Sequence, residues 1–341
     1  MGWLSRCCYQ LVLLQLFLLH FSLTHSKLCS NDQASPLLQF KQLFTDTSNY
    51  SARYMEHWKE DTDCCSWNGV TCDDMGKGHV TGLHLSGGYL NGTIPSNATL
   101  FLLPYLQVLN LSSNHDLKGS FPEANWSNPL QILDVSFTSF SGRLPDSIGN
   151  LKSLTHLDVS CTKFSGRLPD SIGNLKSLTH LDVSCFSFSG RLPDSIGNLK
   201  SLTHLDVSAS RFLGRLPDSI GNLKSLTHLD VSVSKFSGRL PDSIGNLKSL
   251  THFYVSDTSF SGRLPDSIGN LKSLTHLYVY YTSFSGRLPD SIGNLKSLTQ
   301  LDLQNCKFIG SVPASIGTNR VEWSERQQSK GVLIYVRACD A

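Results

Sequence analysis

Histidine, aspartate and serine recur together through the middle of the chain, once in every 24 residues. In each copy, such as His156, Asp158 and Ser160, neighbouring members are two residues apart. These residue types could form a nucleophilic triad. Residues two apart on a strand, however, are separated by about 7 Å, which is too far for a hydrogen-bonded triad. The pattern therefore predicts neither catalysis nor a cofactor site, and a binding surface becomes the leading interpretation.

Two columns of these side chains are expected on one face of the molecule. The histidine column is His156, His180, His204, His228, His252 and His276, and it ends at Gln300. The aspartate column is Asp134, Asp158, Asp182, Asp206 and Asp230, followed by Tyr254, Tyr278 and Asp302. Aspartates about 5 Å apart repel one another, and protonated histidines nearby would relieve them. A pH-tuned binding face, a solvated surface copied by duplication, and metal binding by neighbouring histidines all remain open.

The elements that position these columns follow from a 24-residue unit. Seven near-copies begin at Ser141, Ser165, Ser189, Leu213, Ser237, Ser261 and Ser285. Leu157 and Val159 alternate with polar residues, which predicts a short strand with one buried face. Gly166 and Pro169 then make the chain turn back. Asp170 and the serine after it are predicted to cap a short helical turn on the outer side.

One unit cannot bury its apolar residues alone, so the copies must stack. Ten strands are predicted, beginning at Val80, Leu106, Leu130, Leu154, Leu178, Leu202, Leu226, Leu250, Leu274 and Leu298. With strands about 4.8 Å apart, their sheet should extend on the order of 45 Å. The period and the L-x-x-L-x-L spacing are typical of an α/β-type leucine-rich repeat solenoid. We expect one parallel sheet along the inner face and short helical turns on the outer side.

The chain divides into four expected segments. Residues 1–26 contain Arg6 and an apolar run from Leu11 to Leu19, and are typical of a secretory signal peptide rather than a buried helix. Residues 27–78 form an N-terminal cap, and about ten repeats fill 79–317. Residues 318–341 abandon the period, which predicts a poorly covered last repeat and suggests a truncated reading frame or a misassigned exon. We expect no membrane span in this chain, because no later run reaches 18 apolar residues.

Four cysteines cluster in the predicted cap, namely Cys29, Cys64, Cys65 and Cys72. In an oxidising compartment they predict two disulfides. A zinc site is the alternative, although adjacent cysteines suit four tetrahedral ligands poorly. Ser35 and Pro36 are expected to be the N-cap and first residue of a helix. The apolar face of this helix would cover the first repeat with Leu37, Phe40 and Phe44.

Glycosylation sequons mark the N-terminal part of the chain. They lie at Asn49, Asn91, Asn97, Asn110 and Asn125. Asn110 belongs to a predicted strand and points away from the core. A glycan on Asn110 would therefore block that part of the inner face.

Ligand contact is predicted near the C-terminal repeats. The copies differ mainly at the strand exit, the position just after each strand that Val233 and Tyr281 occupy. These differences arise either through drift on a tolerant surface or through selection for binding. Tyrosines gather there, and tyrosine is common in binding hot spots. The predicted ligand-binding residues are Tyr254, Tyr278, Tyr280, Tyr281, His252, His276 and Asp257. Cys161 and Cys185 occupy equivalent places in adjacent copies, close enough for a disulfide.

The cap sequence C-C-S-W-N-G-V-T-C and the repeat L-x-x-L-x-x-L-x-x-S-x-x-x-F-S-G-x-L-P-x-S-I-G-N resemble the plant extracellular leucine-rich repeat family, above all its receptor-like proteins. The resemblance implies the pairings Cys29–Cys64 and Cys65–Cys72 and a second, outer strand around Gly166 and Pro169. It also implies a curved right-handed superhelix with the parallel β-sheet on its concave face. The family's asparagine after each strand survives only as Asn114. Hydroxyl residues replace it in most copies, and Phe186 should leave a weaker turn. The family's transmembrane helix, C-terminal cysteine cap and cytosolic stub are missing.

A net charge of +2 without a basic stripe argues against nucleic-acid binding. The resemblance implies a non-enzymatic ectodomain, secreted or at the extracellular face of the plasma membrane. Its concave face would bind a peptide, protein or glycan and would signal with a co-receptor kinase in plant defence or development. Mildly acidic surroundings, implied by the same resemblance, would favour histidine charging. The alternatives are a soluble inhibitor similar to polygalacturonase-inhibiting proteins and a truncated, non-functional copy.

Overall fold

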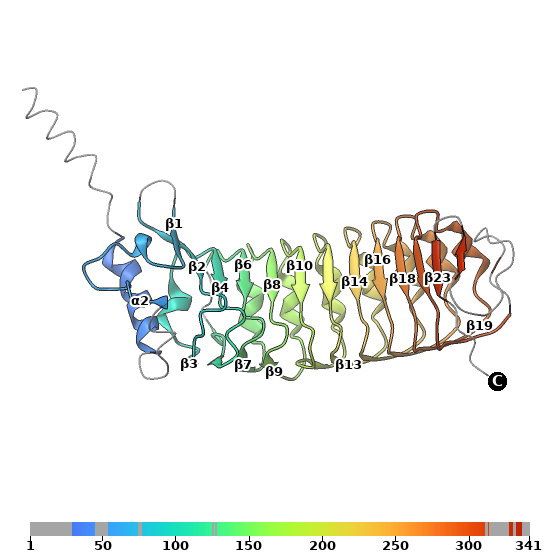
Figure 1. Cartoon of the computed structure of the whole chain (residues 1–341), viewed down its shortest axis with the longest axis horizontal. Coiled ribbons are helices and arrows are strands. Elements are labelled where there is room, and N and C mark those ends of the chain that lie inside the picture. Colours follow the sequence, from blue (N-terminus) through green and yellow to red (C-terminus); the bar gives the residue numbers. More distant parts are fainter. Residues whose placement is uncertain are drawn as a thin grey trace, which may run out of the picture.

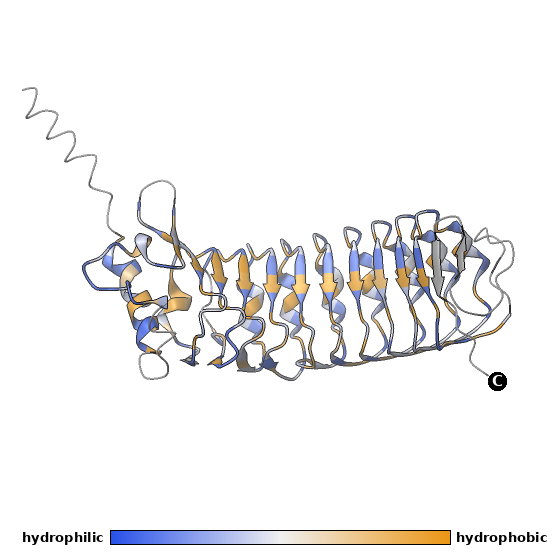
Figure 2. Cartoon of the chain, viewed as in Figure 1, coloured by the Kyte–Doolittle hydropathy of each residue, from blue (hydrophilic) through white to orange (hydrophobic). Residues whose placement is uncertain are grey.

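Stacked coils arranged along one long axis form the molecule (Figure 1). The computed structural model describes residues 29–44, 54–73, 77–124, 126, 128–310, 313, 327–329 and 332–335. The predicted signal peptide lies outside the described residues. Along the array, apolar and polar residues recur at the same places in successive coils (Figure 2). Stacking therefore turns each position of the repeat into a column.

The principal sheet runs along the whole array and has thirteen strands. Its repeat strands are parallel: β2 (Val80–His84), β4 (Val108–Asn110), β6 (Ile132–Asp134), β8 (His156–Asp158), β10 (His180–Asp182), β12 (His204–Asp206), β14 (His228–Asp230), β16 (His252–Tyr254), β18 (His276–Tyr278) and β20 (Gln300–Asp302). These are the ten predicted strands, although all after β2 begin two residues later than expected. The register aligns like residues, as His180 with His204 and Asp182 with Asp206.

Outer strands form two further sheets after the turn. One contains β3 (Gly92–Ile94), β5 (Leu117–Gly119), β7 (Ser139–Gly142) and β9 (Lys163–Phe164). The other contains β11 (Ser189–Gly190), β13 (Arg211–Gly214), β15 (Lys235–Gly238), β17 (Ser259–Gly262), β19 (Ser283–Gly286) and β21 (Lys307–Phe308). The break between these sheets coincides with the coil that contains Phe186.

Short 3₁₀ helices lie on the side away from the principal sheet in most of the coils, and one, η1, lies in the N-terminal cap. They are η1 (Cys64–Ser66), η2 (Thr99–Leu102), η3 (Asp146–Asn150), η4 (Asp170–Asn174), η5 (Asp194–Asn198), η6 (Asp218–Asn222), η7 (Asp242–Asn246), η8 (Asp266–Asn270) and η9 (Asp290–Asn294). The predicted cap at Asp170 and Ser171 is wrong. Pro169 is the N-cap and Asp170 the first helical residue, with no side-chain capping bond. The fixed φ of proline positions the chain for this turn without a hydroxyl or carboxylate cap.

The core is a set of apolar columns that run through the coils. Leu181, Val183, Ile196 and Leu199 are each at most 1% exposed. Phenylalanines at the start of the outer strands stack from coil to coil, with centroid distances between 6.0 and 6.4 Å from Phe164 to Phe308. This continuous core binds each coil to its neighbours, as expected of a repeat that cannot fold alone.

The N-terminal cap is held by two disulfides, Cys29–Cys64 and Cys65–Cys72. Helix α2 (Asn31–Gln42) covers the first coil, and Leu37, Phe40 and Phe44 are at most 2% exposed. Strand β1 (Val70–Cys72) pairs antiparallel with β2 and extends the principal sheet. The three sulfur atoms of Cys29, Cys64 and Cys65 lie within 4.8 Å of one another. Disulfide bonding removes the thiolates that a zinc ion would need.

The predicted start of the cap helix is wrong. Ser30, rather than Ser35, is the N-cap residue, and Pro36 lies inside the helix. The Ser30 carbonyl accepts bonds from the amides of Gln33 and Ala34, and the Asp63 side chain accepts one from the Cys29 amide. These tertiary bonds start the helix a turn earlier. Pro36 then removes only one helical hydrogen bond, in the second turn.

The C-terminal segment was expected to cover the last repeat poorly. Strand β23 (Val332–Tyr335) instead pairs in parallel with β20 and continues the principal sheet. Strand β22 (Gln327–Ser329) pairs antiparallel with β23. An open sheet edge offers unpaired backbone groups to any extended segment, and Val-Leu-Ile-Tyr is a good strand former. The 24-residue period ends near residue 317, but the principal sheet continues beyond it through β23 and β22.

Candidate functional site

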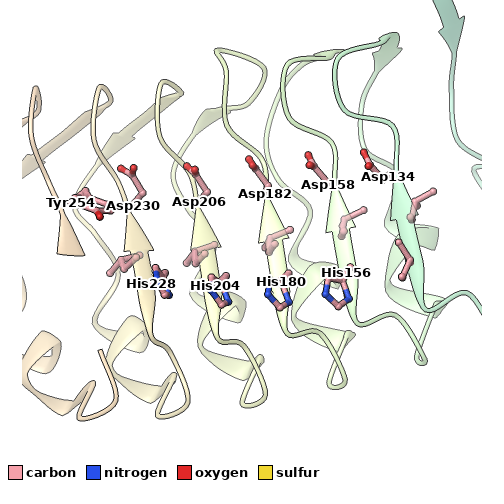
Figure 3. Close-up of a pocket in the computed structure, with 16 residues that line it drawn as sticks. Asp134, His156, Asp158, His180, Asp182, His204, Asp206, His228, Asp230 and Tyr254 are labelled. Carbon is pink, nitrogen blue, oxygen red and sulfur yellow. The ribbon is translucent and has the colours of Figure 1, made fainter. Parts of the chain in front are cut away.

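A shallow groove of about 500 Å³ lies on the principal sheet (Figure 3). Histidines form one side and aspartates the other, and the leucines between them belong to its floor. Its lining is Ile132, Leu133, Asp134, His156, Leu157, Asp158, His180, Leu181, Asp182, His204, Leu205, Asp206, His228, Leu229, Asp230 and Tyr254. The groove therefore follows the solenoid axis across six coils.

The histidine side is a stack of nearly parallel rings. Successive centroids from His156 to His276 are 4.2 to 4.4 Å apart, at interplanar angles of 10 to 12°. In each coil a threonine hydroxyl, such as that of Thr203, donates to the Thr179 carbonyl at 2.9 Å and lies 2.9 Å from His204 Nδ1. A hydroxyl has only one proton to give, so Nδ1 must donate to it. The neutral rings therefore carry their proton on Nδ1 and present Nε2 as an acceptor.

The aspartate side is tied to the turn that follows each strand. In the coil of Asp158, Oδ1 accepts bonds from the Ser160 amide at 2.9 Å and the Ser160 hydroxyl at 2.7 Å. Burial raises the pKa of Asp182 from 3.8 to about 6 against the lowering effect of its Ser184 bonds, and the Asp206 carboxylate adds to the rise. Burial likewise raises the pKa of Asp230. The turn therefore fixes the carboxyl groups, and burial opposes the ionisation of Asp182 and Asp230.

The histidines shift toward neutrality as well. Burial, followed by the charges of neighbouring histidines, lowers the pKa of His180 and of His228. Among the described residues the only histidine–aspartate ion pair is His79 with Asp73, at 3.1 Å between β1 and β2, outside the groove. The expected relief of aspartates by charged histidines is thus corrected. The surroundings of the groove therefore raise the pKa of Asp182 and lower the pKa of His180 and His228, so both kinds of group are shifted toward their neutral forms.

The predicted ligand-binding residues separate into two groups. Tyr254 lines the C-terminal end of the groove, and its ring lies 5.1 Å from that of Tyr278, whose hydroxyl donates to the Gln300 side chain. His252 and His276 continue the ring stack beside this pair.

The other group lies at the strand exit. Tyr280 and Tyr281 contact each other edge to face at 5.8 Å, and Asp257 is exposed nearby. Asp257, after burial, is the largest contributor to the raised pKa of Tyr280. Of the seven predicted residues only Tyr254 lines the groove. The sequence analysis recognised both columns, but its predicted ligand-binding set comprised four tyrosines, two histidines and Asp257 of the C-terminal repeats. The uninterrupted run of aspartates from Asp134 to Asp230 was the signal in the sequence that marks the groove.

Backbone conformation explains why the copies differ at the strand exit. Each copy places there a residue with positive φ, such as Val233 at 50° and Tyr281 at 53°. Their side chains are 46% and 58% exposed. The turn needs a left-handed residue but does not pack its side chain, so the identity of that residue can vary. At this place Cys161 and Cys185 form a disulfide between adjacent coils, with Cα atoms 4.7 Å apart.

The residue that follows the strand exit supports the turn after each strand of the principal sheet. Asn114 donates to the carbonyls of Leu85, Leu111 and Ser112 and accepts from the Leu90 amide. In later coils a single hydroxyl donates to a valine carbonyl, at 2.6 to 2.9 Å. These hydroxyls belong to Thr138, Thr162, Ser210, Ser234, Thr258 and Thr282.

The coil of Phe186 departs from this scheme. Phe186 is 58% exposed and has a φ of 63°. Ser187 instead donates to the carbonyls of Thr162 and Cys185. The neighbouring disulfide and Ser187 thus supply substitute contacts at the turn predicted to be weak.

The sequons have different surroundings. Asn97 is exposed, Asn91 is half-buried, and Asn110 lies on β4 with its Oδ1 bound by Ser112. Asn49 and Asn125 lie outside the described residues. No helix within the described part of the chain is long and apolar enough to span a membrane.

Comparison with known proteins identifies the repeats and the cap. A leucine-rich repeat region model matches residues 93–211 and 209–285, a leucine-rich repeat N-terminal domain model matches 30–73, and a further repeat matches 297–319. The repeat-region model and the N-terminal domain model together cover well over half of the chain. All three models describe repeats or their cap rather than a catalytic domain.

Curated relatives are plant receptor-like proteins. Receptor-like protein 7 of Arabidopsis thaliana is 38% identical over 42% of this chain and 14% of its own length. Receptor-like protein 9DC1 of Solanum pimpinellifolium is 33% identical over 43% of this chain and 19% of its own length. The chain thus matches less than a fifth of the length of either relative.

Solved structures with the same architecture are plant receptor ectodomains. The ectodomain of the receptor kinase GASSHO1/SCHENGEN3 of Arabidopsis thaliana, in complex with CASPARIAN STRIP INTEGRITY FACTOR 2, has a TM-score of 0.78 at 27% identity and covers 83% of this chain and 34% of its own. Arabidopsis HAESA, in complex with the peptide hormone IDA and the co-receptor SERK1, has a TM-score of 0.65 at 28% identity and covers 84% and 52%. Repeat period, cap and fold agree: the chain belongs to the leucine-rich repeat family.

Proposed function

We propose that the chain is the extracellular ligand-recognition part of a receptor-like protein and that the groove between the histidine and aspartate columns holds an extended peptide. The observation that carries the proposal is the groove itself, open along six coils and closed at one end by Tyr254. The similar ectodomain of HAESA was solved with the peptide hormone IDA, and that of GASSHO1/SCHENGEN3 with CASPARIAN STRIP INTEGRITY FACTOR 2.

The groove provides a defined chemistry for such a ligand. Nε2 atoms of the histidine stack accept hydrogen bonds along one side, and carboxyl groups line the other. A peptide backbone offers N–H groups at regular intervals, and basic side chains complement any ionised aspartate. Tyr254 and Tyr278 add a rigid aromatic surface at the end of the groove.

The remaining parts of the proposal concern the cellular setting. Residues 1–26 direct secretion, 27–78 form the cap, 79–317 the repeats and 318–341 the tail. Asn49, Asn91, Asn97, Asn110 and Asn125 are the acceptors available to N-glycans. A co-receptor kinase completes the signal in plant defence or development, as supported by the HAESA complex, which includes SERK1.

Panning a displayed library of random linear peptides against the secreted chain tests the groove. Wild-type protein should enrich peptides that the variant Asp182→Lys/Asp206→Lys fails to retain. The control Asp194→Lys/Asp218→Lys makes the same change in the same two coils, outside the groove, and should retain them. Tyr254→Ala provides a second variant in case the lysines disturb folding, which thermal melting monitors. Equal retention by the groove variants and the control would show that the concave face is not the site.

A further inference from the structure

A second, larger groove lies off the principal sheet, between the outer strands and the 3₁₀ helices. It has a volume of about 1830 Å³ and crosses six coils. Its two charged rows are Arg167, Arg191, Arg215, Arg239, Arg263 and Arg287, and Asp170, Asp194, Asp218, Asp242, Asp266 and Asp290. Nothing in the concave groove involves these residues.

The arginine row is ordered by contact with the next coil. A Cβ atom added to Gly190 would lie 3.0 Å from Cγ of Arg167, and one added to Gly286 would lie 3.1 Å from Cγ of Arg263. The aliphatic stem of each arginine therefore lies across the glycine of the following repeat. These glycines have φ near 80°, so they cannot readily be replaced by a residue with a side chain.

The charged ends of this row are exposed and without protein partners. Within the described residues, Arg167, Arg191, Arg215, Arg239 and Arg263 have no hydrogen bond or ion pair through their guanidinium groups. The aspartates three positions later are also exposed and begin the 3₁₀ helices. The groove consequently has one positive and one negative row, each repeating once per coil.

Coil spacing limits the polymers that can match both rows. Paired outer strands are about 4.8 Å apart, whereas an extended peptide advances about 3.3 Å per residue with alternating side chains. The side-chain carboxylates of an acidic peptide therefore cannot meet one arginine in every coil, a match that the peptide in the concave groove does not require. A polyphosphate chain would satisfy the arginines but would meet the aspartates with repulsion alone.

We propose that this groove binds a linear acidic polysaccharide built of uronic acid residues. Each residue carries a carboxylate and free hydroxyl groups, and its length is close to one coil. Guanidinium groups bind carboxylates through paired, charge-assisted hydrogen bonds. The hydroxyls donate to the aspartate row, so a single ligand uses both rows. The inference goes beyond the proposed recognition of a peptide and uses a different surface.

Titration calorimetry of the secreted chain with linear oligogalacturonate, at about 0.15 M salt, provides the test. The variant Arg191→Gln/Arg215→Gln/Arg239→Gln should bind at least tenfold more weakly than wild type. The control Lys163→Gln/Arg211→Gln/Lys235→Gln removes the same charge from exposed residues outside the groove and should change affinity less than twofold. Tyr254→Ala should also leave this affinity unchanged, which separates the result from the fate of the concave site.

Two further measurements address the chemistry. Methyl-esterified oligogalacturonate should not bind, because its carboxylates are masked. Asp194→Asn/Asp218→Asn/Asp242→Asn should weaken binding, since an amide is a poorer acceptor for sugar hydroxyls than a carboxylate. Tighter binding by this variant, or equal binding of polyphosphate, would show a general attraction for polyanions and overturn the proposal. The proposal would also be overturned if the arginine variant and its Lys163/Arg211/Lys235 control lost affinity equally, or if the wild-type protein did not bind oligogalacturonate.

Discussion

Asp182 and Asp194 stand twelve residues apart in the same coil, and each belongs to a column repeated through the array. Asp182 lies on the concave face, half-buried and bound by the Ser184 amide at 2.9 Å. Asp194 is exposed and is the first residue of η5. Duplication copied both carboxylates equally, but the surroundings of Asp182 bury it and raise its pKa.

The lysine and arginine columns show a similar contrast between a charged group that is bound by the stack and one that is exposed. Lys224 Nζ donates to the Gly221 carbonyl at 2.8 Å, within its own coil, and to the Asn246 carbonyl in the next. Arg215 lies across the next glycine, and its guanidinium has no hydrogen bond or ion pair with the part of the chain that the structure describes. A column of charges can thus stabilise the stack or be available to a ligand, and the hydrogen bonds distinguish the two.

The largest expected effect comes from disturbing the coil spacing on which both surfaces depend. A Cβ on Gly221 would lie 2.4 Å from the Ser243 carbonyl oxygen, a backbone atom that cannot rotate away. Gly221→Ala should cost about 3 kcal/mol of unfolding free energy, measured by urea denaturation. Gly142→Ala is the control, since no atom lies within 4 Å of its Cβ; its positive φ should cost about 1 kcal/mol. Similar losses would mean that the helices do not set the spacing.

The pH dependence of stability should distinguish the two aspartate columns. The pKa of Asp182 is about 6 in the folded protein and 3.8 for the free side chain, so the folded state binds the proton more strongly. Protonation therefore stabilises the fold at low pH, and this contribution is lost as pH rises from about 4 to 6. A difference of about two pKa units corresponds to about 3 kcal/mol.

Asp182→Asn should accordingly stabilise the protein by about 2 to 3 kcal/mol at pH 7 and by little at pH 4. Urea unfolding at both pH values measures this difference. Asp194→Asn makes the same substitution at an exposed position of the same coil and is the matched control. A parallel shift of both variants at all pH values would contradict the contrast between the columns.

The smallest effects should separate the lysine column from the arginine column. Lys224→Gln removes two bonds to backbone carbonyls and should cost about 1 kcal/mol. Arg215→Gln removes none and should change stability by less than about 0.5 kcal/mol. Thermal melts of these two single variants, each of which removes one positive charge, measure the difference in stability. A larger loss for Arg215→Gln would place the guanidinium in the stack rather than at a free surface.

The ten strands and the cap helix face could be predicted because period and apolar alternation report directly on burial. Leu157 and Val159 point inward in every coil, and stacking is the only way to cover them. The start of α2 could not be predicted, because Ser30 becomes the N-cap only through bonds of its neighbours to Asp63 and the disulfide partner Cys64. Likewise, the pairing of β23 with β20 depends on an edge that only the finished sheet possesses.

For the candidate site, the sequence by itself determined which side chains form columns and that they repeat once per coil. It could not determine their state. His204 carries its proton on Nδ1 because the Thr203 hydroxyl is already committed to the Thr179 carbonyl of the preceding coil. Asp182 holds its proton more strongly than a free aspartate because neighbouring coils exclude water from it. Both properties arise between repeats, where only the tertiary structure brings the groups together.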